Sequence, residues 1–233
     1  MNKIISRLKK AAKILMGREL DSRIQVAKQV EWFGITHAGF YVCTENLNEN
    51  SIVYSFGVGD NIAFDEDLIN RFHCNVYGFD PTPKSVEYIK KKKPQRWFKF
   101  FEYGISYFDG IIKFYLPKNP DHVSCATFNR WGYDEAKNRP IEVPVKKLST
   151  ISKELGHSKI NVLKFDIEGS EYDILDDVLS SDLEIDQILI EFHHRFKAIG
   201  IDKTKTAIRG LNHAGYKIAA ISDTMEEYTF VKV

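Results

Sequence analysis

The densest run of chemically active side chains lies in Lys164–Glu171 (KFDIEGSE), where three acids surround a glycine directly after an apolar stretch. If that stretch is a buried strand, some of these acids must point into a crevice, where burial and like charge raise a pKa or a cation binds. We assign Asp166 and Glu168 to such a site. Glu171 fits the ordinary chemistry of a helix N-terminus, where acids favour the first turn.

A second reactive group follows the next apolar run, Gln187–Phe192 (QILIEF), and comprises Glu191, His193 and His194. Side chains alternate along a strand, so one histidine should face the same crevice as Asp166. A histidine beside a carboxylate can act as a general base on a hydroxyl group. As an alternative, Asp166, Glu191 and His193 offer ligands for a divalent metal ion, and the pattern does not decide between the two roles.

A glycine turn upstream points to a cofactor. In Gly57–Asn61 (GVGDN), two glycines let the backbone pass close to a ligand at a helix N-terminus. A dinucleotide fingerprint requires a third small residue, but Ile62 occupies that place. Asp80, about twenty residues after the glycines, can accept both hydroxyl groups of a ribose. This combination predicts a nucleoside without a pyrophosphate, such as S-adenosylmethionine (SAM), rather than NAD.

The predicted cofactor site collects the residues that follow the first three strands. Tyr103 and Gly104 end the third strand, where a small residue such as glycine would admit the edge of an adenine. The full predicted set is Phe56, Gly57, Gly59, Asp60, Asn61, Asp80, Pro81, Tyr103, Gly104 and Asp166.

Strand and helix patterns alternate along the chain and must position these residues. Short runs rich in β-branched and aromatic residues predict strands at 51–57, 75–79, 97–103, 110–116, 141–145, 160–165, 187–192, 216–221 and 227–233. Helical spacing predicts helices at 61–72, 85–92, 148–155, 170–179 and 203–214. We therefore expect an α/β fold, a doubly wound and mainly parallel sheet with an antiparallel C-terminal edge strand. In such sheets, ligands bind outside the carboxyl ends of the strands.

The N-terminal segment is basic, because Asn2–Arg18 carries six Lys and Arg residues and no acid, with apolar residues at helical spacing. We expect residues 1–50 to form a helical extension before a single catalytic domain at 51–233. The basic helix either docks on this domain or lies on an anionic membrane surface, held by about 1 kcal/mol per basic residue. No secretory signal is recognisable, which predicts a cytoplasmic protein, peripheral on the inner membrane face in the second case.

The composition excludes several classes of protein. With 33 Lys and Arg against 32 Asp and Glu, the net charge is +1, so nothing draws the whole chain toward nucleic acid and DNA is not an expected partner. Hydrophobic residues make up 43% of 233, which suits one globular core and not a disordered chain. Cys43, Cys74 and Cys125 form no CxxC pair and are expected to be reduced.

The segment Lys164–Glu171 resembles the KxDxEGxE signature of the FkbM family of SAM-dependent methyltransferases. The EFH at Glu191–His193 recurs downstream in that family. From the region of Ser51 onward, the order of the glycine turn and the acids is similar to that of the class I SAM methyltransferase fold, which is a Rossmann-like sheet of seven strands.

The glycine turn departs from the usual pattern of the family. The family commonly has an acid before the first glycine and an Ala-Asn pair after it, and this chain has Ser55, Val58 and Gly59 at those places. We expect Asp60 or Asp65 to take over part of the missing role at the methionine end of SAM.

The resemblance implies O-methylation, often of sugar hydroxyl groups on a glycan or small-molecule acceptor, with SAM held by the glycine turn and Asp80. The sulfonium already activates the methyl group, so the protein must align the acceptor oxygen with it and remove a proton. We expect His193 or Asp166 to be the base, and Glu168 and His194 to orient the acceptor. The sequence indicates neither the identity of the acceptor nor an oligomeric state.

Three other functions are compatible with parts of the sequence. An NAD-dependent oxidoreductase would explain the glycine turn, but Ile62 and the absence of an obvious Tyr-xxx-Lys pair argue against it. A non-catalytic, membrane-associated scaffold would use the basic N-terminal helix and a degenerate cofactor fold. An RNA methyltransferase would use the aromatic residues of Trp97–Phe100 beside Lys90–Lys93. Those aromatic residues alternate within a strand, which favours the core for most of them.

Overall fold

The computed structural model describes residues 13–15, 17, 19–117, 125, 127 and 140–233. Nearly all of the basic segment Asn2–Arg18 lies outside these residues, and so does the membrane contact expected of it. Within the described part, no helix is both long and apolar enough to cross a membrane. The three cysteines are buried thiols that form no disulfide within the described part, as expected.

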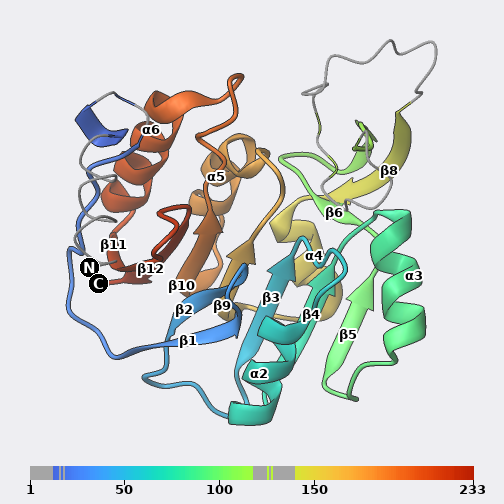
Figure 1. Cartoon of the computed structure of the whole chain (residues 1–233). Coiled ribbons are helices and arrows are strands. Elements are labelled where there is room, and N and C mark those ends of the chain that lie inside the picture. Colours follow the sequence, from blue (N-terminus) through green and yellow to red (C-terminus); the bar gives the residue numbers. More distant parts are fainter. Residues whose placement is uncertain (1–12, 16, 18, 118–124, 126, 128–139) are drawn as a thin grey trace.

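Seven strands form the central sheet, in the spatial order β11-β12-β10-β9-β3-β4-β5 (Figure 1). They are β3 (Ile52–Phe56), β4 (Asn75–Phe79), β5 (Phe98–Phe101), β9 (Lys159–Phe165), β10 (Glu184–Glu191), β11 (Tyr216–Ile221) and β12 (Glu227–Lys232). All neighbours pair in parallel except β12, which is antiparallel to both β10 and β11. The predicted doubly wound, mainly parallel sheet is therefore confirmed.

The antiparallel C-terminal strand was expected at the edge of the sheet and lies one position inside it. The short turn after β11 folds β12 back alongside β11, and the other side of β12 pairs with β10. Strand β11 is therefore the edge strand at this end.

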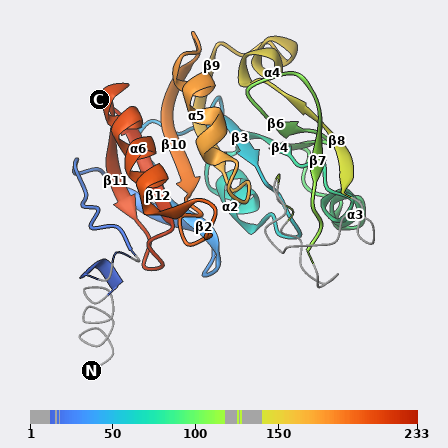
Figure 2. The ribbon, with the colours of Figure 1, turned by 90° about the horizontal axis from the view of Figure 1, so that it is seen from above.

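Helices cover both faces of the sheet. They are α2 (Ala63–Phe72), α3 (Pro83–Lys92), α4 (Leu148–Leu155), α5 (Glu171–Leu179) and α6 (Gly200–His213). One face forms a hydrophobic cluster with α4, α5 and α6, and the other forms a cluster with α2 and α3. Figures 1 and 2 show α3 beside the β5 end of the sheet and α6 beside the β11 end. The crossovers run in opposite directions from β3 and β9, which places a topological switch point between these strands.

Alternation along the strands sends neighbouring side chains to opposite faces. On β3, Tyr54 and Phe56 join the cluster with α4, α5 and α6, and Val53 joins the cluster with α2. Ser55 therefore points to the α2 face as well. It is paired in register with Lys164 of β9, and both residues are buried. Two polar side chains thus lie beside each other under α2.

A β-hairpin packs on the same face as α2. Its strands are β1 (Val30–Ile35) and β2 (Ala38–Cys43), which pair antiparallel. The side chain of Gln187 in β10 accepts a hydrogen bond from the N–H of Cys43 and donates one to its carbonyl oxygen, each at 2.9 Å. These two buried bonds fix the end of the hairpin to the central sheet.

The hairpin corrects the expectation that residues 1–50 are helical, which is wrong for residues 30–43. Phe33, Phe40 and Val42 are buried against α2 from the two strands, and aromatic and β-branched residues with this spacing favour strands. The domain division at Ser51 stays a prediction.

A second, three-stranded sheet has the order β6-β8-β7. Its strands are β6 (Gly104–Ile105), β7 (Gly110–Phe114) and β8 (Ile141–Lys146). The strand expected at 97–103 is split, because β5 ends at Phe101 and the chain then leaves the central sheet to form β6. This departure carries β6 and β7 toward the carboxyl ends of the central strands.

Candidate active site

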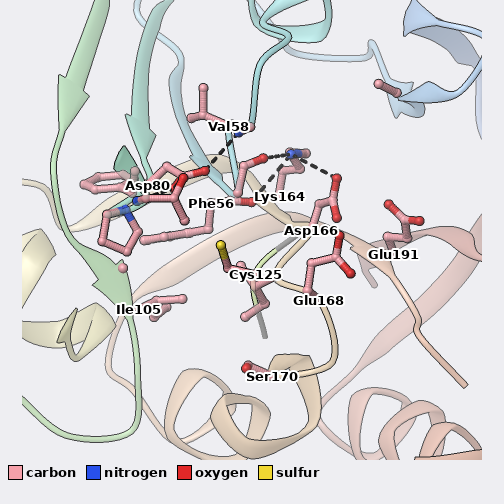
Figure 3. A pocket seen from close by; sticks show the side chains of 18 of the residues that line it. Phe56, Val58, Asp80, Ile105, Cys125, Lys164, Asp166, Glu168, Ser170 and Glu191 are labelled. Carbon is pink, nitrogen blue, oxygen red and sulfur yellow. Dashed lines mark hydrogen bonds and ion pairs between the residues drawn. The ribbon is translucent and has the colours of Figure 1, made fainter. Parts of the chain in front are cut away.

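A cavity of about 370 Å³ opens at the carboxyl ends of β3, β4, β9 and β10 (Figure 3). It lies at the topological switch point, where open α/β sheets bind ligands. Its volume falls within the range of small-molecule sites, about 300–1,000 Å³. The predicted site residues that line it are Phe56, Gly57, Gly59, Asp60, Asn61, Asp80, Pro81, Gly104, Asp166, Glu168 and Glu191. The cavity therefore brings most of the predicted site together.

Other walls of the cavity come from segments that the sequence did not assign to the site. His37 and Phe40 belong to the hairpin, Ile112 and Phe114 to β7, and Thr127 to the connection before β8. None of these residues directly follows a strand of the central sheet, so the rule that located the other residues could not find them.

The glycine turn is held from two sides. Gly57 has a positive φ of 81°, and a Cβ atom there would lie 1.6 Å from the carbonyl oxygen of Asp166. The N–H of Asp166 donates to the carbonyl oxygen of Phe56 at 3.1 Å, and the Lys164 ammonium donates to that of Gly57 at 2.8 Å. The ends of β3 and β9 are thus locked together, and only glycine fits at position 57.

Asp80 joins the glycine turn to the end of β4. Its Oδ2 accepts a hydrogen bond from the N–H of Gly59 at 2.9 Å, and its Oδ1 accepts from the N–H and the hydroxyl group of Thr82 at 2.8 and 2.6 Å. A carboxylate has about four acceptor positions. Asp80 therefore shapes the turn and retains one acceptor position for a ribose hydroxyl group. Its expected contact with both hydroxyl groups stays a prediction.

Tyr103 does not line the cavity. Its ring packs 5.6 Å from the ring of Phe79, and the Lys146 ammonium lies 4.6 Å from its centre. The neighbouring Gly104 does line the cavity, next to Pro81. Gly104 thus lies in the cavity wall as expected, and its contact with an adenine stays a prediction. The expectation that Tyr103 lines the site is wrong, because its side chain packs against the core.

Three carboxylates form the wall opposite Asp80. Asp166, Glu168 and Glu191 are partly exposed to the cavity, with side-chain exposures of 30, 21 and 27%. Burial, and then the charge of Asp166, raise the pKa of Glu191 to about 9. Glu191 is therefore the member of this wall that favours the protonated form at neutral pH.

Glu171 has the helix N-terminal role expected of it. Helix α5 begins at Glu171, and Oε1 of this residue accepts hydrogen bonds from the N–H groups of Ile167 and Gly169 at 3.1 and 3.2 Å. The side chain is fully buried. It also fixes His193, whose Nδ1 lies 2.9 Å from the same oxygen as an ion pair.

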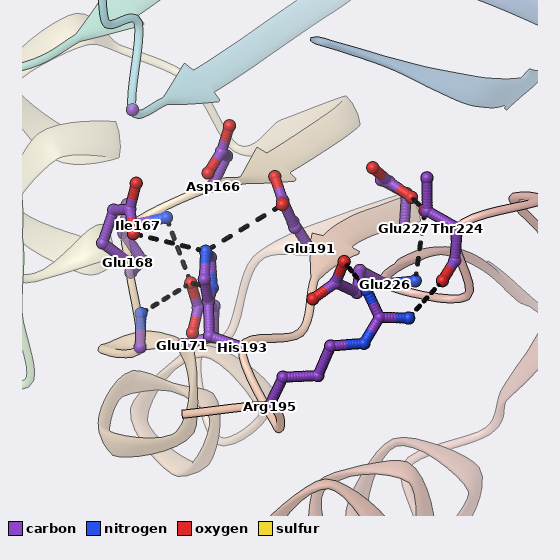
Figure 4. Close-up of polar contacts among 12 residues, drawn as sticks. Asp166, Ile167, Glu168, Glu171, Glu191, His193, Arg195, Thr224, Glu226 and Glu227 are labelled. Carbon is purple, nitrogen blue, oxygen red and sulfur yellow. Dashed lines mark hydrogen bonds and ion pairs between the residues drawn. The ribbon is translucent and has the colours of Figure 1, made fainter. Parts of the chain in front are cut away.

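His193 sits behind the cavity wall among carboxylates (Figure 4). Its Nε2 lies 3.6 Å from Glu168 and 4.0 Å from Glu191, and its side chain is 7% exposed. Burial alone would lower its pKa, but Glu171, Glu168 and Asp166 outweigh burial and raise the pKa to about 10. The raised pKa favours the imidazolium form at neutral pH, and His193 does not line the cavity, so the expectation that it faces the crevice is wrong. Its role as general base stays a prediction that this geometry does not support.

We expect His193→Gln to lower the free energy of unfolding by about 2 kcal/mol at pH 6, where a charged hydrogen-bonding group is lost. The folded-state pKa of about 10 lies above the usual 6.5, so the folded protein keeps a proton that the unfolded chain releases between these values. This stabilisation is complete below pH 6.5 and is lost as the pH rises through 10. Urea unfolding of both proteins from pH 6 to 10 should therefore show the difference shrinking, and a constant difference would contradict a charged His193.

His194 points away from the cavity. Its Nε2 lies 2.6 Å from Oε1 of Glu19, and both side chains are fully buried. The guanidinium of Arg195 lies 2.7 Å from the other oxygen of Glu19. These contacts tie the N-terminal segment to the loop after β10. The expectation that His194 orients an acceptor is wrong, because the strand ends before it and its alternation no longer applies.

The possible metal ligands lie close together. One ligand atom each of Asp166, Glu191 and His193 falls within 4.8 Å of the others. The residue types fit a divalent metal site, where a cation would compete with protons for Glu191 and His193, whose pKa values are both raised. The metal stays a prediction.

A second cavity of about 680 Å³ adjoins the first, and the two share Ile105, Ile112, Thr127 and Ser170 in their walls. Its other walls carry aromatic residues and charged residues. These are Tyr107, Phe108 and Tyr115 from the region of β7, and Asp173 and Lys203 from α5 and α6. Such a mixture suits a ligand with both apolar faces and hydroxyl groups.

The strand order, the cavity at the switch point and the glycine turn with its acid define the class I SAM methyltransferase fold. Within this class, the chain belongs to the FkbM methyltransferase family, whose domain model matches residues 45–231.

The chain is similar to a human protein described as probable methyltransferase-like protein 24, with 26% identity over 184 residues. The match covers 74% of this chain and 43% of the human protein. A rat protein of the same description is 24% identical over 159 residues, covering 67% of this chain and 36% of that protein. The chain thus spans less than half of the curated relatives it matches.

Solved structures with a similar chain path include the fibrillarin pre-rRNA processing protein of Methanococcus jannaschii, with a TM-score of 0.47 and 9% identity. That match covers 91% of this chain and 86% of the other. A second is Aeropyrum pernix fibrillarin in complex with SAM, with a TM-score of 0.43, 8% identity, and coverage of 91% and 85%.

Proposed function

We propose that this protein is a SAM-dependent O-methyltransferase that methylates a sugar hydroxyl group of a glycan or small-molecule acceptor. The observation that carries the proposal is the pair of adjoining cavities, with a nucleoside-sized pocket on one side and an aromatic and charged pocket on the other. Asp166 and Glu168 line the first cavity. Ser170 and Thr127 line both cavities and so mark the place where the two adjoin.

The residues of the first cavity fit SAM. The backbone of Gly57–Asn61 would face the ligand, the free acceptor position of Asp80 would take one ribose hydroxyl group, and Pro81 with Gly104 and Ile105 would enclose the adenine. When bound, SAM supplies a methyl group that its sulfonium already activates. The protein then has to position the acceptor oxygen in line with that group and exclude water.

Asp166 is the proposed general base. The raised pKa values of Glu191 beside it and of His193 favour their protonated forms at neutral pH, so neither is suited to take a proton from the acceptor. The fixed charge of His193 holds Glu168 and Glu191 in place from behind the wall. The acceptor would lie in the second cavity, between the exposed ring of Tyr107 and the start of α5.

Mass spectrometry of the purified protein tests the proposal, with bound SAM or S-adenosylhomocysteine as the expected result. Calorimetry should then give binding of SAM and not of NAD, and methyl transfer from labelled SAM should occur on members of a panel of sugars. Binding of NAD instead would support the oxidoreductase, and transfer to RNA alone would overturn the sugar acceptor. An arm with EDTA tests the divalent metal, because chelation abolishes a reaction that needs one.

The membrane-associated scaffold makes a different prediction. It requires no SAM binding, together with binding to anionic liposomes that disappears when residues 1–18 are deleted. We expect SAM binding to persist in both the full chain and the shortened one, because the described cavity contains none of these residues.

A further inference from the structure

A buried acid in the first cavity has no role in the reaction described above. Asp65 lies in the first turn of α2, lines the cavity and is only 2% exposed. Among the described residues, no group forms a hydrogen bond with its Oδ1. A buried carboxylate oxygen without a partner is costly, so a site that keeps one is suited to a ligand that donates to it.

The surroundings of Asp65 are organised around charge. Ser55 and Lys164 face α2 from neighbouring strands, and the Lys164 charge and the Ser55 hydroxyl group both lower the pKa of Asp65. The Lys164 ammonium donates to the carbonyl oxygens of Gly57 at 2.8 Å and Phe56 at 3.5 Å. An ammonium has three donors, and the third faces Asp166, whose Oδ2 lies 3.9 Å away as an ion pair. An unpaired carboxylate oxygen of Asp65 and the ammonium of Lys164, which also lines the cavity, thus flank the glycine turn.

This pairing fits one end of SAM better than the other. The ribose and the adenine are neutral, and the sulfonium has no N–H or O–H to donate. The amino-acid end carries an ammonium, which donates, and a carboxylate, which accepts. Asp60, the other acid near the turn, is exposed to solvent, so its carboxylate has no unsatisfied buried oxygen. The opposite charges of Asp65 and Lys164 therefore complement the amino-acid end.

We propose that Asp65 binds the α-ammonium group of SAM and that Lys164 faces its carboxylate. The inference rests on the proposed function and adds the residue that recognises the amino-acid end. Helix α2 supplies the acid, while the end of β3 carries Ser55 in the same buried patch.

The role of Asp65 can be tested by measuring, by calorimetry, the binding of two nucleosides whose sulfur is an uncharged thioether. S-adenosylhomocysteine has the amino-acid end, and 5′-methylthioadenosine lacks it. We expect Asp65→Asn to weaken binding of the first by about 10- to 100-fold, the worth of a hydrogen bond between charged groups, and to change binding of the second by less than about twofold. Equal weakening of both would show a structural role and overturn the proposal, as would no change in either.

One further variant sharpens the experiment. Glu66→Gln is the matched control, since Glu66 is the next acid on α2 and pairs with Lys92 at 3.0 Å outside the cavity. It should leave both affinities within about twofold of the original protein.

The unmodified protein offers a test that needs no variant. Burial raises the pKa of Asp65 to about 6, although the Lys164 charge and the Ser55 hydroxyl group lower it, and the nearby Glu66 charge raises it slightly. Protonation below that pH should weaken S-adenosylhomocysteine more than 5′-methylthioadenosine, and parallel weakening would contradict the proposal. If the unmodified protein binds neither nucleoside, the proposed function itself fails, and this inference with it.

Discussion

Gly57→Ala is expected to lower the free energy of unfolding by about 4 kcal/mol and to abolish SAM binding. The added Cβ would lie 1.6 Å from the carbonyl oxygen of Asp166 and 2.7 Å from its carbonyl carbon, so backbone must move. The positive φ of 81° adds the strain of a left-handed conformation. Displacing Asp166 also disturbs the proposed base. Urea unfolding and calorimetry with SAM measure the two effects.

Gly156→Ala provides the matched control for Gly57→Ala. Gly156 also has a positive φ, of 74°, at the end of α4, but a Cβ atom there meets no atom within 4 Å. We expect this variant to lose about 1 kcal/mol through conformation alone and to bind SAM normally. Equal losses in the two variants would mean that the contact with Asp166 does not decide the effect.

Asp166→Asn is expected to lower turnover by about two to four orders of magnitude while SAM binding is retained. Asn has nearly the same shape but cannot take a proton from an acceptor hydroxyl group. The N–H of residue 166, which bonds to Phe56, is unaffected by the change. Steady-state kinetics with a sugar acceptor and calorimetry with SAM separate the chemical step from binding.

Asp176→Asn serves as the control for Asp166→Asn, because Asp176 is an exposed acid of α5 that lines neither cavity. It should leave turnover within about twofold. If Asp166→Asn keeps near-normal turnover, the base lies elsewhere. A parallel loss of SAM binding would instead assign Asp166 to the cofactor.

The sequence located the site residues that directly follow a central strand. The glycine turn, Asp80, Asp166 and Glu191 each end a strand with a clear apolar pattern, and parallel strands bring such ends to one edge. That inference needs only the order of elements and the period of side chains. The alternation of side chains stops where a strand ends. For this reason the sequence predicts that His193 or His194 faces the crevice, whereas neither lines the cavity.

The hairpin shows a different limit. Residues 30–43 carry alternate apolar residues, but nothing local says that they cover the switch point and place His37 and Phe40 in the cavity wall. Their position depends on Gln187, which lies far along the chain and bonds to the hairpin at Cys43. Contacts between distant segments leave no signature in either segment alone.

The amino-acid order by itself therefore determined the fold class, the edge of the sheet that holds the site, and the chemical types of the residues there, because strand period and element order are local properties. The tertiary structure alone decided which groups carry protons. The pKa of His193 is raised because carboxylates surround it, and that of Glu191 is raised because its carboxyl group is largely shielded from water and lies near Asp166. Protonation depends on the distances between charges and their exposure to water, and those distances exist only after folding.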